Sequence, residues 1–569
     1  MVVAALAVVL ALPDAASGHA YLVRTVPAAS GVLDVPPPEV LLTYDEAVEP
    51  RLAIVSVTDA QGRQQATGPA RRSPSDPDTL AVALRPRLPE GWYLVYWRAI
   101  SVDGHPVQGA FTYAVGPNPG PAPQFPIPHL SATAKTPQLL ITRWLMLLSV
   151  MAAIGLFVLR ALVARPAVRR VDGSSLGAVS VAFIACSVVA LIAIPLYLDV
   201  ATANDSLRSV FDLGALVPLY RVTAFGRAIV DLEACFALFC FAAFVALRLD
   251  RPERPRRSVA ELAATAGALL AAAAVLAVPG AAGHPAQTSP RGLTVALDWL
   301  HLAGGSLWLG GLIGLLVLWF AQRQDVRVPV LSVVVPRFSN VALVSVLALG
   351  GAGIGETIDH MPAVNALWET GFGQAILVKT GLIGAAMVLA SGNLLRTKPR
   401  LAAAGERPAP AKAAAATLRT LISGELVLVV GTVFTAAVLS SLAPPPPAFA
   451  LENAAIAKVG PGRVARDVRR AGYDLRVIVS PNKAVAPDSF ALQISKSGRP
   501  VRGANVTLAL NHLEMQMPQQ QYQLIERQPG VYSRSAPALV MVGRWGLMFA
   551  VALRDGTSFT APIVDQANG

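Results

Sequence analysis

The stretch LDWLHLAGGSLWLGGLIGLLVLWF, residues 297–320, is a long apolar run in which Asp298 carries the only charge. A helix needs about 20 predominantly apolar residues to cross a bilayer. This stretch therefore predicts a membrane-spanning helix. Similar runs recur through the middle of the chain, where we expect eight spans, at about 139–162, 176–198, 226–248, 260–279, 293–319, 338–358, 374–395 and 419–442.

The composition indicates a membrane protein that also carries soluble domains. Of the 569 residues, 54% are hydrophobic and 14% are charged, whereas an ordinary soluble domain has about 25% charged residues. Residues 19–120 and 451–569 have the composition of soluble domains. The net charge of +12 does not predict nucleic acid as a partner, because no RNA- or DNA-binding motif accompanies the basic residues and many lie in short links between spans.

Those links predict how the bundle is oriented. Alternate links, at 160–175, 248–258, 321–337 and 396–419, hold 18 Lys and Arg residues, and the other links between spans hold 4. Lys and Arg concentrate in cytoplasmic loops. Eight spans then place both soluble domains on the extracytoplasmic side of a bacterial inner (plasma) membrane.

The first residues, MVVAALAVVLALPDAASG (1–18), predict a signal peptide. Ala16 and Gly18 suit the positions before a signal-peptidase cut, which would make His19 the new N-terminus. No Lys or Arg precedes the apolar run, so an uncleaved anchor is the alternative.

Residues 19–118 alternate apolar and polar side chains in short stretches, such as VLLTY (40–44) and GWYLVYWRAI (91–100), with Pro and Gly between them. This pattern is typical of an immunoglobulin-like β-sandwich. Within it, Asp103 and His105 project to the same side of an extended segment. Together with the amine and imidazole of an N-terminal His19, they suit the N and O ligand geometry of Cu(II).

The stretches HAYLVRTVPAASGVL (19–33) and WRAISVDGHPVQGAFTYAVG (97–116) resemble the CopC family of periplasmic copper carriers. The resemblance implies that His19, Asp103 and His105 bind Cu(II). Residues 19–120 contain no Met, so we do not expect the Met-rich Cu(I) site that some members of the family have.

A Pro-rich linker (119–136) leads into the membrane domain (137–445), whose polar residues predict a second metal site. Ionisable residues inside membrane spans are costly and usually functional. Asp298 and His301 share one helical face, with His301 roughly 12 Å into its span at about 1.5 Å per residue. The predicted membrane copper site comprises His284, Asp298, His301, Glu356, His360 and Met361.

Alternatives to this membrane site stay open. His284 and His360 would then be solvated link residues, and His301 would make an interhelical hydrogen bond. Lys379 and Glu425 could extend a polar path, or Lys379 could neutralise a carboxylate.

The membrane domain resembles the CopD family through Asp298, His301 and the WLGG sequence at 308–311, and through the stretches RFSNVALVSVLALGGAG (337–353) and GQAILVKTGLIGAAMVLASGNLLR (373–396). The resemblance implies a copper-handling membrane protein that imports copper. No Cys-Pro-Cys or ATP-binding motif occurs, which argues against an ATP-driven pump.

Residues 446–569 alternate like strands again, and a seven-strand sandwich of roughly 100 residues fits them. In ANVTLALNHLEMQMP (504–518), Met515 and Met517 share a strand face near His512, and this ligand set suits Cu(I). The alternative is that the methionines belong to the core. The segment resembles the YtkA-like domains often found with copper proteins.

These observations predict a mixed fold, an eight-helix membrane bundle flanked by two periplasmic β-sandwiches, in a protein that imports copper and is not an enzyme. Cu(II) is the expected ion, with Cu(I) as a second form, and copper chaperones on either side of the membrane are expected partners. One alternative is a haem-binding membrane redox protein that uses two of His284, His301 and His360. Another is a copper sensor or scaffold without transport.

Overall fold

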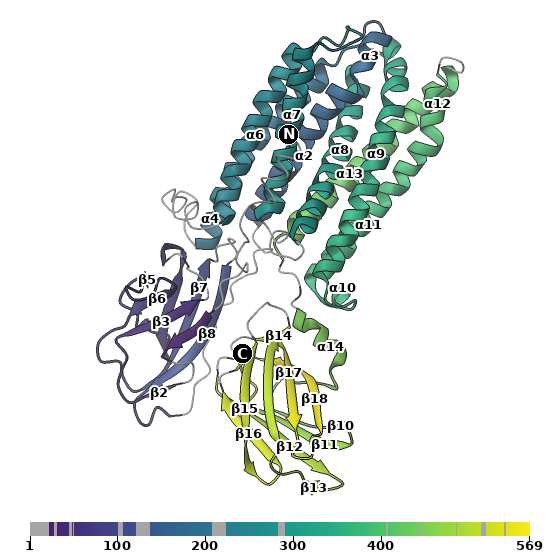
Figure 1. Ribbon diagram of the computed structural model, residues 1–569. Coiled ribbons are helices and arrows are strands. Elements are labelled where there is room, and N and C mark those ends of the chain that lie inside the picture. The colour runs from purple at the N-terminus through teal and green to yellow at the C-terminus, as the bar shows by residue number, and fades with distance from the viewer. Residues whose placement is uncertain are drawn as a thin grey trace.

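Figure 1 shows the computed structural model, in which two β-rich domains lie at the same end of a bundle of long helices. The structure describes residues 22–568 apart from 28–30, 45–47, 49, 101–105, 121–136, 207–223, 283–290, 405–407, 443, 444, 446, 485, 514–518, 537, 540 and 541.

Eight helical segments in the described part of the chain are long and apolar enough to cross a membrane, which confirms the predicted number of spans. They are α2 (Pro137–Val158, continued by the π-helical turn η3, Leu159–Val163, and by α3, Arg165–Arg170), α4 (Gly177–Ser206), α6 (Ala224–Leu249), α7 (Val259–Ala282), α8 (Arg291–Ala321), α9 (Gln324–His360), α11 (Gly371–Gly392, continued by the π-helical turn η6, Asn393–Thr397, and by α12, Lys398–Ala402) and α13 (Pro408–Leu439).

Helix α9 begins well before the predicted start at residue 338. Its first part, which contains Pro329 and Pro336, falls in the predicted cytoplasmic link at 321–337. Membrane helices nevertheless tolerate proline where neighbouring groups satisfy the freed backbone. The guanidinium of Arg327 lies 4.9 Å from the centre of the Trp319 ring on α8, so this part of α9 also packs against its neighbour.

Glycines allow α8 to lie unusually close to α2 in the middle of the bundle. A Cβ atom at Gly155 on α2 would stand 2.0 Å from the carbonyl oxygen of Ser306 and 2.8 Å from Cα of Gly310. A Cβ at Gly311 would overlap the ring of Phe338 on α9. Small residues permit such close approach of helix backbones, which is a main source of packing energy in membranes.

An ionic cluster ties three helices together at the end of the bundle away from the soluble domains. Asp250, after α6, pairs with Arg160 and, at 2.8 Å, with Arg165. Ser258 and Glu261 cap α7 reciprocally: the Ser258 N–H donates to Glu261 Oε2 at 2.6 Å, and the Glu261 N–H donates to Ser258 Oγ at 3.2 Å. This exchange is a capping box, and it fixes the turn between α6 and α7.

The N-terminal domain is a sandwich of two four-stranded sheets. One sheet has the order β1-β3-β6-β5, with β1 Leu22–Val26, β3 Glu39–Tyr44, β6 Thr79–Ala83 and β5 Arg71–Arg72. The other has the order β2-β8-β7-β4, with β2 Val32–Leu33, β8 Pro106–Val115, β7 Gly91–Ile100 and β4 Ile54–Asp59. Leu42 and Leu80 from the first sheet and Val57 and Val95 from the second share one buried core.

The C-terminal domain contains ten strands in one continuous sheet, where seven strands were predicted. The order is β10-β11-β12-β16-β15-β14-β17-β18-β9, with β13 beside β12. The strands are β9 (Ala457–Val459), β10 (Val464–Arg470), β11 (Tyr473–Ser480), β12 (Asp488–Lys496), β13 (Arg499–Pro500), β14 (Asn505–His512), β15 (Gln520–Gln528), β16 (Val531–Ala536), β17 (Gly543–Ala552) and β18 (Ser558–Ala567). The sheet folds over, so that Leu475 and Leu492 pack in the same core as Leu508 and Leu547.

Both soluble domains contact the membrane bundle or its outer loops. Leu52, in the short helix η1 (Pro50–Leu52), packs against Leu198 of α4 and Phe225 of α6. Phe449 and Leu513 of the C-terminal part pack against the short helix α10 (Ala366–Glu369). The soluble domains also touch one another, because Leu94, Tyr96 and Ala110 cluster with Ala484.

Two buried carboxyls make the stability of the C-terminal domain depend on pH. Asp488 accepts from the backbone N–H of Asn482 at 2.6 Å, and the Asn482 side chain donates to Asp565 at 2.9 Å. All three residues are fully buried. Burial raises the pKa of Asp488 from 3.8 to about 7 and the pKa of Asp565 from 3.8 to about 6.

We expect the free energy of unfolding of this domain to fall as the pH rises from about 4 to 7, because the folded state holds protons that the unfolded state has released. Asp488→Asn keeps the accepting oxygen and removes the charge. It should flatten the pH dependence and raise the free energy of unfolding at pH 8 by about 1 kcal/mol or more. Both effects are measured by heating the full chain and using protease cleavage within residues 457–567 as the readout of unfolding of this domain. Asp467→Asn, whose side chain is 79% exposed, is the control; equal pH profiles in native and Asp488→Asn chains would contradict the assignment.

Candidate functional site

His301 on α8 makes a direct contact with Lys379 on α11. The Lys379 Nζ lies 3.1 Å from His301 Nε2. When Lys379 is an ammonium, which has donors and no lone pair, it donates to Nε2 and the ring proton is on Nδ1. The imidazole also lies against α9, because a Cβ atom at Gly353 would stand 3.5 Å from its Cε1. The predicted membrane residue His301 thus lies where α8, α9 and α11 meet.

Two carboxylates lie close to this pair. Asp298 is one turn before His301 on α8, and Glu356 is on α9; both act electrostatically on Lys379 and on each other. A Cβ at Gly280 of α7 would stand 2.6 Å from Asp298 Oδ2, and this oxygen is buried without a hydrogen-bond partner among the described residues. Asp298 and Glu356 therefore lie within electrostatic range of the lysine that contacts His301.

The other predicted members of the membrane site are placed differently. Met361 packs with Ala366, Phe449 and Leu513, between the outer loop and the C-terminal domain. His284 and the side chain of His360 lie outside the described residues. Among the residues that the structure describes, no three His, Cys, Asp or Glu side chains form a metal-binding group.

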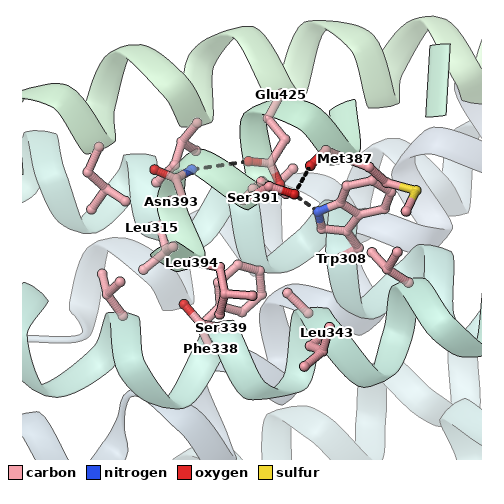
Figure 2. A pocket seen from close by; sticks show the side chains of 17 residues that line it. Trp308, Leu315, Phe338, Ser339, Leu343, Met387, Ser391, Asn393, Leu394 and Glu425 are labelled. Carbon is pink, nitrogen blue, oxygen red and sulfur yellow. Dashed lines mark hydrogen bonds between the residues drawn. The ribbon is translucent and has the colours of Figure 1, made fainter. Parts of the chain in front are cut away.

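A second polar group lies further along α8, beside a cavity of about 120 Å³ between α8, α9, α11 and α13. Figure 2 shows Glu425 of α13 between Trp308 and Asn393. Trp308 Nε1 donates to one carboxylate oxygen at 2.7 Å and Asn393 Nδ2 to the other at 3.2 Å. Asn393 opens the π-helical turn η6, and π turns inside α-helices are frequent at functional sites.

The rest of this cavity is mainly apolar. Ser339 and Ser391 add hydroxyls, and Met387 adds a thioether. The sequence analysis gave Glu425 as a possible part of a polar path, but it did not predict that Trp308 and Asn393 donate hydrogen bonds to its carboxylate. Trp308 was noted only because the WLGG sequence resembles the CopD family.

The predicted Cu(II) ligands His19, Asp103 and His105 lie outside the described residues, but the segments around them are described. Leu22 of β1 pairs with Tyr44 of β3, and β7 and β8 pair up to Ile100 and Pro106. The rings of Tyr44 and Trp97 meet across the sandwich, with centroids 5.6 Å apart. The start of β1 and the adjoining ends of β7 and β8, at Ile100 and Pro106, are therefore at one end of the sandwich.

That end of the sandwich is the one next to the membrane bundle. Arg98, two residues before the end of β7, donates from Nη2 to the carbonyl oxygen of Asn204 on α4 at 3.5 Å. In Figure 1 the same ends of β7 and β8 lie beside α4.

In the C-terminal domain the structure describes one of the three predicted ligands. His512 ends β14 and is 3% exposed. Its ring meets the Trp545 indole edge-on, with centroids 4.9 Å apart, and its Nε2 lies 3.4 Å from the carbonyl oxygen of Val542. Met515 and Met517 lie outside the described residues, so the predicted Cu(I) site stays a prediction.

Comparison with known proteins agrees with both resemblances. Residues 22–116 match the family model of the CopC domain, and residues 332–439 match that of Copper resistance protein D. The chain is 24% identical over 555 residues to Copper transport protein CutJ of Bacillus subtilis (strain 168), which covers 94% of this chain and 93% of that protein.

Further similarities concern the N-terminal domain. Over 97 residues the chain is 34% identical to Protein YobA of Escherichia coli (strain K12), covering 17% of this chain and 78% of that protein. The crystal structure of CopC from Methylosinus trichosporium OB3b matches with 28% identity and a TM-score of 0.16, covering 19% of this chain and 100% of that one. With a CopC domain, a CopD segment and a similarity to CutJ along nearly its whole length, the chain belongs to the CopC/CopD family of copper resistance and transport proteins.

Proposed function

We propose that this protein imports copper across the bacterial inner membrane, with capture of Cu(II) by the N-terminal domain on the periplasmic side. The observation that carries the proposal is His301, which lies inside the bundle in the half of α8 nearest the soluble domains. Its imidazole is a ligand that copper accepts, and the carboxylates of Asp298 and Glu356 act electrostatically on the neighbouring Lys379. Ionisable groups at this depth are rarely structural.

The position of the N-terminal domain supports delivery to His301. The end of the sandwich at which β7 stops lies against α4, where Arg98 donates to Asn204, and Leu52 anchors the domain on α4 and α6. Copper released from that end would pass into the outer half of the bundle, which contains His301. The carboxylates of Asp298 and Glu356 attract the cation, and His301 supplies a nitrogen ligand.

The inner cavity supports continuation of the path. It begins about two turns beyond His301 on α8, at Trp308. The Glu425 carboxylate borders it, and Met387 and two serines offer further contacts for a cation.

The copper content of cells grown in copper-supplemented medium tests the proposal. Cells with the native chain should contain more copper than cells without it, and His301→Ala should abolish the increase, because it removes the nitrogen ligand inside the bundle. Ile354→Ala, at a position on α9 that is 64% exposed, is the matched control and should behave like the native chain. Immunoblots of membranes check that all variants are present in equal amounts.

Two outcomes would contradict import. Lowered copper with the native chain would mean export or sequestration outside the cell. Equal copper in all cells would favour a scaffold or a haem protein, and absorption in the Soret region of the purified chain would identify the latter.

A further inference from the structure

We propose that Lys379 is a tethered cation that competes with copper for His301, so that copper enters the site by displacing the lysine and leaves as the lysine returns. The inference rests on the proposed function and adds to it the residue that keeps copper from being trapped.

The competition follows from the chemistry of the imidazole. Each ring nitrogen without a proton has one lone pair, directed in the plane of the ring. In this structure Nε2 lies 3.1 Å from the Lys379 Nζ, and an ammonium at that position donates to the Nε2 lone pair. A metal ion binds such a nitrogen at about 2 Å along the same direction, so the ammonium and the metal exclude each other. The remaining nitrogen, Nδ1, then carries the ring proton and is not a ligand.

The surrounding charges favour an exchange of one cation for another. Asp298 and Glu356 both act on Lys379, and a charge inside a membrane protein needs a partner. Copper arriving with Lys379 still in place would leave excess positive charge between α8, α9 and α11. If copper left without the lysine returning, the two carboxylates would lose their counter-charge. Lys379 balances the cluster whenever copper is elsewhere.

The His301–Lys379 bond crosses a sparsely packed boundary, because α11 packs along α13 and makes few contacts with α8. On the same helix, Met387 lies two turns further on, about 12 Å at 1.5 Å per residue, where it lines the cavity of Figure 2. The bond therefore lies between the outer carboxylates and the inner cavity, on the path proposed for copper.

The test compares Lys379→Leu, which removes the cation and adds no ligand atom, with Lys379→Arg, which keeps a cation. Equilibrium binding is measured on the purified full chain with Cu(II) buffered by a competing chelator. Every chain also carries His105→Ala, so that the N-terminal site does not contribute. Cellular copper is measured with the same Lys379 substitutions in the otherwise native chain.

We expect Lys379→Leu to bind copper at least about 10-fold more tightly, because Lys379 no longer occupies the His301 Nε2 in a fraction of the molecules. Cellular copper should fall towards that of cells without the protein, because slower dissociation limits transport. Lys379→Arg should stay close to the native chain in both assays. A loss of structure cannot mimic this result, since damage to the site would weaken binding.

The outcomes separate the two proposals. If Lys379→Leu binds copper no more tightly than the native chain, Lys379 is not a competitor, while loss of accumulation in His301→Ala would still support import. If the native chain accumulates no copper but Lys379→Leu tightens binding, import is wrong and the competition stands. If Lys379→Leu is absent from the membrane, Lys379→Gln replaces it in both the binding and the cellular copper measurements.

Discussion

Gly155→Ala should prevent the membrane bundle from assembling. The new Cβ would stand 2.0 Å from the Ser306 carbonyl oxygen and 2.8 Å from the Gly310 Cα. Both are backbone atoms, so no side-chain rotation can relieve the overlap. The helices α2 and α8 must separate, and overpacking of this kind costs about 3 kcal/mol or more. Size-exclusion chromatography and thermal unfolding of the detergent-solubilised chain measure the loss.

The matched control for this substitution is Gly384→Ala on α11, where a Cβ would meet nothing within 4 Å. It should leave the protein intact or stabilise it slightly, because alanine is favoured over glycine within a helix by up to about 1 kcal/mol. If Gly155→Ala gives the same yield and melting temperature as Gly384→Ala, the close approach of α2 and α8 is wrong.

His105→Ala should weaken Cu(II) binding to the N-terminal domain by about 100-fold or more, since removal of a metal-site residue commonly costs one to two orders of magnitude. One residue added before His19 should do nearly the same, because it removes the chelate between the terminal amine and the imidazole. Competition with a chromophoric chelator measures both, on the full chain in a His301→Ala background that removes the membrane site.

Asp34→Ala, at an exposed position in the same domain, is the control that removes a carboxylate elsewhere. Unchanged affinity after the N-terminal addition would rule out the chelate and leave His105 as a ligand. Unchanged affinity after His105→Ala would exclude the predicted site.

The secondary structure could be predicted from the sequence because it depends on local patterns. Twenty-residue apolar runs and alternating strands are properties of neighbouring residues, and they identified the eight spans and the N-terminal sandwich. The start of α9 was missed, because Pro329 and Pro336 are breakers in a soluble protein and are tolerated in a membrane helix.

The contacts of the candidate site depend instead on how the helices are rotated, and the sequence says little about rotation here. The spans are apolar on all sides, so periodicity does not identify which face points inward. The spacing of Asp298 and His301 showed that they share a face, but not that Lys379, from a distant helix, would reach His301. The same holds for Asn393 and Glu425. The sequence left two alternatives for Lys379, a polar path or the neutralisation of a carboxylate. In the structure Lys379 interacts electrostatically with Asp298 and Glu356, and its hydrogen bond to the imidazole was not predicted.

The packing of Leu52 against Leu198 and Phe225 has a kinetic consequence. A separate carrier protein would have to find the bundle by diffusion, so the transfer rate would depend on the product of two concentrations. In this chain the N-terminal domain, which we propose captures Cu(II), is covalently joined to the bundle and packs on it, which corresponds to a fixed effective concentration. The proposed exchange of copper between the two parts would then be first order in the protein, with the same rate per molecule in a cell with few copies as in a cell with many.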